Sequence, residues 1–176
     1  MKEFVRYEDL PLETTDGLMI NVEFISNLYL VANNKVIQCI IRDITDRKLV
    51  EDALTVSETR YRRLFESAKD GILILDAETG KITDVNSFLI EMLGYSKEQF
   101  IEKAIWEIGL FKDILTNQDK FSELQLKEFV RYEDLPLETT DGLMINVEFI
   151  SNVYLVNNYK VIQCSIRDNA DRKKIK

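Results

Sequence analysis

The chain has 176 residues, a hydrophobic share of 45%, only two prolines and six glycines, and a net charge of −8. This composition is typical of a globular chain of one to one and a half domains. The acidic balance argues against a nucleic-acid-binding surface, which requires clustered Lys and Arg. No apolar run approaches the roughly 18 residues of a membrane-spanning helix, and no signal-peptide pattern opens the chain. We therefore expect a cytoplasmic protein that neither binds nucleic acid nor inserts into a membrane.

A long internal repeat divides the chain. Residues 2–48 recur at 127–173, whereas residues 49–126 occur once. Such self-similarity defines the folding units of a chain. We predict the C-terminal half of a duplicated domain at 1–48, a helical linker at 49–60 and a complete domain at 61–176. Six positions differ between the copies: Leu28/Val153, Ala32/Asn157, Asn34/Tyr159, Ile40/Ser165, Ile44/Asn169 and Thr45/Ala170.

The linker and the residues that follow it carry an apolar seam. Its members recur at alternating spacings of four and three, which is typical of a heptad pattern over about two heptads. A helical connector that pairs with a second chain is one interpretation, and an amphipathic helix packed on its own domain is the other. The seam consists of Val50, Leu54, Ser57, Tyr61 and Leu64.

Two β-rich runs around Glu78-Thr79-Gly80 predict a hairpin over residues 72–85. Asn86 then suits a helix N-cap, and Gly94 suits the stop of that helix. Ser96 and Gln99 form a capping-box pattern that predicts a short helix over 97–102. Apolar residues at helical spacing in 105–128 predict one or two further helices.

The second copy of the repeat predicts three strands, at 132–139, 143–156 and 160–167. Asp141-Gly142 and Asn157-Asn158 mark the turns between them. Pro136 cannot donate to a strand ladder, so the first of these strands should lie at a sheet edge. Cys39 and Cys164 occupy the same position in the two copies, and we expect one buried free thiol that occurs twice.

Order and motifs together resemble the PAS fold with its C-terminal PAC region. The resemblance covers residues 58–173 as a whole domain and residues 3–48 as the second half of another. It implies an α+β fold: a five-stranded antiparallel sheet with short helices on one face, here with an extra three-stranded meander and a helical connector. The residues that carry it are Tyr61-Arg62-Arg63-Leu64-Phe65-Glu66, Lys69-Asp70-Gly71-Ile72, Gly80, Val85-Asn86, Met92-Leu93-Gly94-Tyr95-Ser96, Asp141-Gly142, Val147-Glu148 and Arg167-Asp168.

The resemblance also implies residues that couple the sheet to an outgoing helix. The first copy carries Asp43-Ile44-Thr45-Asp46-Arg47, which matches the family's Asp-Ile-Thr signature followed by an Arg. The resemblance implies a coupling role for Asp43, Thr45 and Arg47. In the second copy Asp168 and Arg172 remain, but Asn and Ala replace Ile and Thr. The alternative interpretation is that these residues only cap and charge-balance a helix start.

The chain contains no histidine, which excludes Ser-His-Asp and Cys-His catalysis and the usual axial haem ligand of haem-binding PAS domains. Phosphate-binding glycine motifs and the photoreactive Asn-Cys-Arg flavin motif are also absent. We therefore expect no enzyme activity, no metal site and no identifiable cofactor. A pocket between helices and sheet, where this family often holds ligands, is one interpretation of five residues, and a filled core is the other. They are Phe88, Met92, Trp106, Phe149 and Cys164.

The N-terminal half-domain must bury its apolar face somewhere. It can pair with a second chain, displace residues 127–173 from the sheet, or stay unfolded. Because residues 127–173 follow the rest of the complete domain directly, we expect them to complete its sheet. We interpret the protein as a PAS sensory and dimerisation module of a multi-sensor signalling protein such as a sensor kinase, with neighbouring PAS or output domains and a homodimeric state. The alternative is a non-sensing assembly fragment in which the half-domain only mediates homodimerisation or strand exchange.

Overall fold

The protein folds into two compact units, Met1–Tyr61 and Arg62–Lys176. The computed structural model describes residues 3–108, 121–122 and 125–169. Helix α1, Thr45–Ser67, begins in the first unit and ends in the second. It extends beyond the predicted linker, residues 49–60, in both directions.

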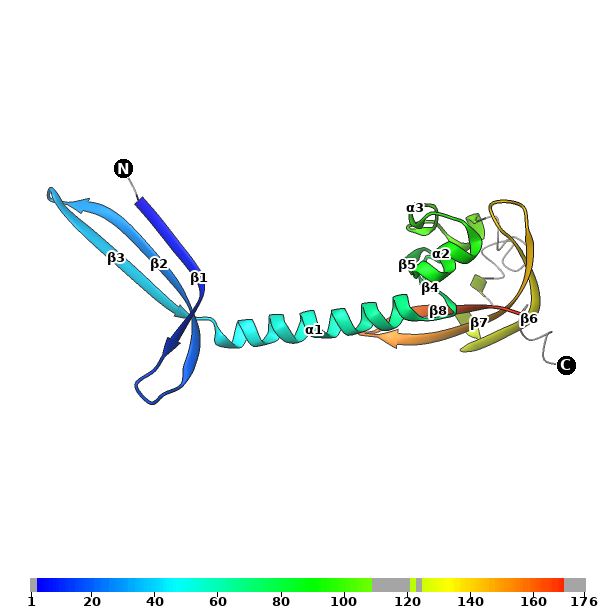
Figure 1. Cartoon of the computed structure of the whole chain (residues 1–176), viewed down its shortest axis with the longest axis horizontal. Coiled ribbons are helices and arrows are strands. Elements are labelled where there is room, and N and C mark those ends of the chain that lie inside the picture. Colours follow the sequence, from blue (N-terminus) through cyan, green and yellow to red (C-terminus); the bar gives the residue numbers. More distant parts are fainter. Residues whose placement is uncertain (1–2, 109–120, 123–124, 170–176) are drawn as a thin grey trace. The chain divides into compact units, whose positions relative to one another are not determined.

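The first unit contains a three-stranded antiparallel sheet in the order β1-β2-β3 (Figure 1). Asp9, in the irregularity between Tyr7 and Leu10 on β1, has a φ of 59°. A two-residue turn, Ala32 and Asn33, joins β2 to β3 with φ angles of 47° and 64°. Both angles lie in the left-handed region that such tight hairpins require. The strands are β1 Glu3–Glu13, β2 Met19–Val31 and β3 Asn34–Asp43.

The second unit is built on a five-stranded antiparallel sheet in the order β5-β4-β8-β7-β6. This confirms the predicted fold class. Pro136 lies on β6, at an edge of the sheet as predicted. The elements are β4 Gly71–Asp76, β5 Ile82–Val85, α2 Ser87–Leu93, α3 Lys97–Phe100, the 3-10 helix η1 Ile105–Glu107, β6 Phe129–Glu138, β7 Met144–Val156 and β8 Tyr159–Asp168.

The short helices α2 and α3 lie over one face of this sheet (Figure 1), and the core fills the space between them. Leu89 and Leu93 of α2 are fully buried, and Leu73 of β4 and Phe149 of β7 meet them from the sheet. Period-two alternation explains why one side of each central strand is apolar. In β8, Ile162, Cys164 and Ile166 are buried while Gln163 and Ser165 are only partly so.

Local signals set the boundaries of the short helices. Asn86 caps α2 by accepting from the Leu89 amide at 3.1 Å, and Gly94 ends it with a φ of 76°. Gln99 accepts from the Ser96 amide at 2.8 Å at the start of α3. Helix α3 ends at Phe100, two residues earlier than predicted, and Glu102 has a φ of 63°, which no helix accommodates.

The expected buried free thiol is confirmed for Cys164, whereas the same expectation is wrong for Cys39, which is exposed. Cys39 lies on β3, whose side chains are nearly all exposed. Of the helices expected in 105–128, the structure contains η1 and helical residues at 121–122 and 125–126, while residues 109–120 and 123–124 lie outside the described residues. Among the described helices, none combines the length and apolar character needed to cross a bilayer.

Candidate functional site

The five predicted pocket residues do not share one environment. Phe149 and Cys164 are fully buried in the core between sheet and helices. Met92 and Trp106 are half-buried and pack against that core from its margin. The Trp106 ring lies 5.2 Å from the ring of Phe121, centroid to centroid. Phe88 is half-buried on α2.

Burial dominates the chemistry of Cys164. It raises the pKa of the thiol to about 12, and the neighbouring Ser151 hydroxyl offsets this only in part. A thiol with such a pKa is uncharged near neutral pH and is a poor nucleophile. Cys164 is therefore suited to packing.

The predicted coupling residues Asp43 and Thr45 meet at the start of α1. The Asp43 carboxylate accepts from the Thr45 amide at 2.9 Å and from its hydroxyl at 2.6 Å, and these bonds lower the pKa of Asp43. The Thr45 hydroxyl oxygen in turn accepts from the Asn21 amide of β2 at 3.0 Å. Asp43 and Thr45 thus connect the sheet of the first unit to the helix that leaves it.

Arg47 lies two residues after Thr45 on α1. It donates to Glu51 at 2.8 Å, an exposed pair at i,i+4. Lys48 beside it pairs with Asp9 of the β1 irregularity at 2.8 Å. Exposed pairs of this kind contribute little stability on their own.

The second copy repeats only part of this arrangement. The Asn169 amide donates to Asn146 O at 2.9 Å, as the Ile44 amide does to Asn21 O at 2.8 Å. Asp168 is exposed at the end of β8. Ala170 has no hydroxyl to take the place of Thr45. Arg172 lies outside the described residues.

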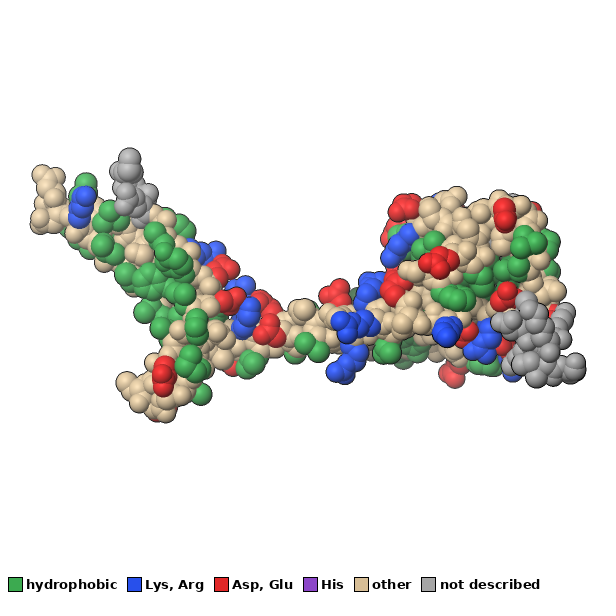
Figure 2. Space-filling model, viewed as in Figure 1, with side chains coloured by type: hydrophobic (Ala, Val, Ile, Leu, Met, Phe, Trp, Pro, Cys, Tyr) green, Lys and Arg blue, Asp and Glu red, His purple; other side chains and the backbone are tan. Residues whose placement is uncertain are grey.

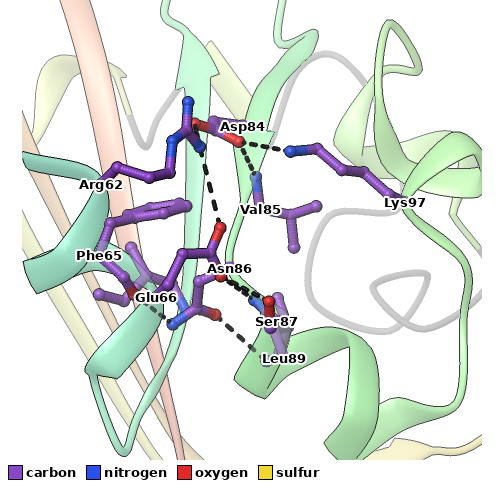
Figure 3. Close-up of polar contacts among 10 residues, drawn as sticks. Arg62, Phe65, Glu66, Asp84, Val85, Asn86, Ser87, Leu89 and Lys97 are labelled. Carbon is purple, nitrogen blue, oxygen red and sulfur yellow. Dashed lines mark hydrogen bonds and ion pairs between the residues drawn. The ribbon is translucent and has the colours of Figure 1, made fainter. Parts of the chain in front are cut away.

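A polar junction joins the last turn of α1 to the core of the second unit (Figure 3). At its centre is Asn86, whose side chain is fully buried. Its Oδ1 accepts from the amides of Ile72 at 2.8 Å and Leu89 at 3.1 Å. Its Nδ2 donates to the carbonyl oxygens of Phe65 at 3.1 Å and Asp70 at 3.0 Å. One amide thus connects β4, α2, the end of α1 and the loop after it.

Glu66 makes a second link between α1 and α2. Its carboxylate accepts from the Ser87 amide at 2.8 Å and from the Ser87 hydroxyl at 2.6 Å (Figure 3). Burial raises the pKa of Glu66, but the Ser87 bonds together with Lys97 and Arg62 outweigh it and leave the pKa lowered. Glu66 is therefore a carboxylate at neutral pH.

Asp84 of β5 joins two cations from different elements. It pairs with Arg62 of α1 at 3.0 Å and with Lys97 of α3 at 3.2 Å. Arg62 also lies 3.8 Å from Glu66. These partly exposed pairs connect α1 and α3 to β5 but contribute little stability.

The loop after α1 is held to the sheet by Asp70. Arg167 of β8 donates to both Asp70 oxygens, at 2.9 and 2.6 Å. The hydrogen bonds from Arg167 lower the pKa of Asp70, although burial opposes them. Arg167 also lies 3.8 Å from the buried Glu148 of β7. The geometry is the two-pronged one that guanidinium and carboxylate favour.

The junction was only partly visible in the sequence. The capping of α2 by Asn86 is predicted from its local pattern, but its contacts with Phe65 and Asp70 cross 21 and 16 residues. Glu66 and Asp70 belong to the motifs that carry the family resemblance, which is the signal that could have identified them. The hydrogen bonds of the junction connect the end of α1 to β4, to α2 and to the loop that follows α1.

Comparison with known proteins agrees with this fold. Residues 59–130 match a family model described as a PAS domain. The PAS domain of an HTR-like protein from Haloarcula marismortui superimposes with a TM-score of 0.57 at 25% identity. That match covers 69% of this chain and 98% of the other. The matched family is a sensory module rather than a catalytic domain.

Two curated relatives are similar to this chain, one named as a kinase and the other as a sensor. The chain is 23% identical over 168 residues to sporulation kinase E of Bacillus subtilis, covering 96% of this chain and 22% of the relative. It is 28% identical over 126 residues to the methyl sulfide methyltransferase-associated sensor of Methanosarcina acetivorans, covering 70% of this chain and 12% of the relative. The chain thus spans less than a quarter of the length of either relative.

Proposed function

Because this chain contains a PAS domain, we propose that it is a sensory module that relays changes in the packing of that domain to neighbouring domains through α1. The contact that carries the proposal is the one from Asn86 to the Phe65 carbonyl. Phe65 is in the last turn of α1, and its side chain is buried. A shift of α2 therefore acts directly on the end of the helix.

The relay has a defined mechanical route. Leu89 and Leu93 project from α2 into the core, so a ligand or a repacked side chain there displaces α2. Asn86 and Ser87 at the start of α2 hold Phe65 O and Glu66. A packed element that shifts between two discrete positions is a common device for such transitions.

Hydrogen exchange in the full chain tests this route. Leu93→Ala leaves a cavity beneath α2, and we expect faster exchange in residues 62–67 than in the wild type. Glu91→Ala, on the exposed side of the same helix, is the matched control and should leave residues 62–67 unchanged. Unchanged exchange in Leu93→Ala, with α2 itself loosened, would reject the relay.

Sensing requires that something enters the core. The sequence identifies no cofactor, so the test examines any small molecule that co-purifies with the protein. A small molecule released on denaturation and detected by mass spectrometry would support sensing. A protein that releases none, and whose melting temperature no metabolite mixture changes, favours the assembly role described below.

Pairing of α1 with a second copy would give the relay an output. Val50, Leu54 and Tyr61 of the apolar seam are all exposed on α1. Leu54→Glu should shift the chain from dimer to monomer in light scattering, because a charge in the seam opposes helix pairing. Val56→Glu, an equally apolar position off the seam, is the control.

The uncovered sheet of the first unit favours a second candidate function, that of an assembly unit. Figure 2 shows hydrophobic side chains gathered over β1–β3, and Phe4, Leu30, Ile37 and Ile41 are each more than half exposed. Large exposed apolar patches mark interaction sites. In this role the half-domain mediates homodimerisation or strand exchange, and no ligand is sensed.

A further inference from the structure

The two copies of the repeat form the same three-stranded arrangement, but one apolar face is buried and the other is mostly exposed. On β6–β8, the positions facing the helices are fully buried, whereas their counterparts on β1–β3 are mostly open. Leu12, Ile37 and Ile41 are 42%, 65% and 59% exposed, against 0% for their counterparts. Val22 is the exception, since it is buried in both settings. The buried set is Leu137, Val147, Phe149, Ile162, Cys164 and Ile166.

This contact face has the same residues in both copies. The counterparts 125 positions earlier are Leu12, Val22, Phe24, Ile37, Cys39 and Ile41, and none of them is among the six substituted positions. Close packing demands complementary shapes. The face of β1–β3 therefore keeps the side chains that pack against α2 and α3 in the complete domain.

The strand edge is also retained. In the complete domain β8 pairs with β7 on one side and with β4 on the other, with Gly71 opposite Ile166 and Asp76 opposite Val161. Its counterpart β3 pairs with β2 only, so the opposite edge is open among the described residues. An open edge is a template for another strand.

A charged contact completes the match. Arg167 of β8 holds Asp70, the residue just before β4. Its counterpart Arg42 lies 3.3 Å from Glu23, and its side chain is 67% exposed. A carboxylate in the position beside β3 that Asp70 occupies beside β8 would lie next to the Arg42 guanidinium.

We propose that β1–β3 is an acceptor sheet for a PAS front half, and that a second copy of this chain supplies that front half. The front half means residues 62–108, which include β4, β5, α2, α3 and η1. Three features carry the inference: the apolar face, the open β3 edge and Arg42. The inference deepens the assembly role proposed above and rests on it.

The geometry of α1 explains why the partner is a second chain. Docking in the β8 manner places Gly71 opposite Ile41, about 5 Å away across an antiparallel pair. The 23-residue helix α1 joins those two strands and spans about 35 Å at 1.5 Å per residue. A continuous α1 cannot connect points so close together. In a two-fold dimer each helix runs from its own β3 to the front half that covers its partner's β3, and the two helices lie antiparallel.

Within the described residues of this sequence, two sheets share the contact face that packs on one front half, so the two sheets compete for it. Residues 127–169 follow the front half along the same chain, and β8 holds it in the structure. Transfer to β1–β3 of a second copy is expected when β6–β8 is weakened.

Three full-length variants test the acceptor with matched substitutions. Phe149→Asp disables β6–β8, Phe24→Asp makes the same change on β1–β3, and the double variant disables both. Each is examined by thermal unfolding, light scattering and thiol labelling, with Cys39 and Cys164 reporting which sheet is covered. Buried thiols react slowly, so at least about a tenfold change in labelling rate marks covering or release.

We expect Phe149→Asp to unfold cooperatively as a dimer in which Cys39 is protected and Cys164 is reactive. Phe24→Asp should keep the wild-type labelling pattern, and the double variant should lose cooperative unfolding. If Phe149→Asp unfolds like the double variant, β1–β3 is no acceptor. A folded monomer with protected Cys39 would overturn the choice of a second copy. A monomeric wild type contradicts the assembly role alone, because exchange is measured in Phe149→Asp.

Discussion

The Asn86 side chain donates to the main-chain oxygen of Phe65 at 3.1 Å, and this bond ties the last turn of α1 to the start of α2. The donor is fully buried, and the same side chain accepts from the Ile72 and Leu89 amides. A buried amide with all four bonds made is costly to replace. Entry helix and core are therefore coupled through one residue.

Substitution of Asn86 should separate capping from tethering. Asn86→Ala leaves two amides and two carbonyls without their partner, and we expect a loss of about 3 kcal/mol in unfolding free energy. Asn86→Asp keeps both accepting bonds and places a carboxylate at a helix start, but it loses the two bonds donated to the Phe65 and Asp70 carbonyls. We therefore expect a smaller loss of about 2 kcal/mol. Denaturant unfolding measures both values. Equal wild-type stability in Asn86→Ala would contradict the account.

The Asp70–Arg167 pair should make stability depend on pH in the acid range. The pKa of Asp70 is lowered from 3.8 by Arg167, so the unfolded chain takes up the proton first as the pH falls. The contribution of the pair is complete above about pH 5 and is lost as the pH falls below 3.8 toward the folded-state pKa. Asp70→Asn should cost about 0.5 to 1 kcal/mol at pH 7, since both side chains are partly exposed.

Acid titration of unfolding checks this prediction. The difference between wild type and Asp70→Asn should shrink as the pH falls from 5 toward 3, whereas Glu78→Gln, an exposed turn position, should show little difference at any pH. A gap between wild type and Asp70→Asn that stays constant with pH would show that Asp70 acts by packing alone.

The two hairpin turns of the repeat provide an internal comparison. Asn157 has a φ of 48° and its counterpart Ala32 a φ of 47°. Asn tolerates the left-handed region better than Ala does. Asn157→Ala should lower the unfolding free energy of the second unit by about 1 kcal/mol, and Ala32→Asn should slow hydrogen exchange in β2 and β3. If neither substitution has an effect, the turn residues do not limit the stability of these hairpins.

The two thiols should differ sharply in reactivity at low protein concentration. Cys39 is exposed, whereas burial raises the pKa of Cys164 to about 12. In the Cys164→Ser variant the remaining thiol should react at once with a disulfide reagent. In Cys39→Ser it should react only as the protein unfolds. Similar labelling rates in the two variants would mean that the front half moves between β6–β8 and β1–β3.

Sequence patterns predicted the features that depend on neighbouring residues. The strands of the repeat follow alternation, the ends of α2 follow Asn86 and Gly94, and the edge position of β6 follows Pro136. Contacts between distant elements left no comparable pattern. The same local sequence surrounds Cys39 and Cys164, yet one is exposed and the other buried, because burial depends on what packs against the sheet.

The relay claim is tested most directly by combining Leu93→Ala with Asn86→Asp in the full chain. Hydrogen exchange of residues 62–67 is measured in the wild type, both single variants and the double variant. If Asn86 carries the coupling, Leu93→Ala speeds exchange in these residues on the wild-type background and adds nothing once Asn86→Asp is present. If the effect of Leu93→Ala is the same on both backgrounds, the core reaches α1 by another route and the account is wrong.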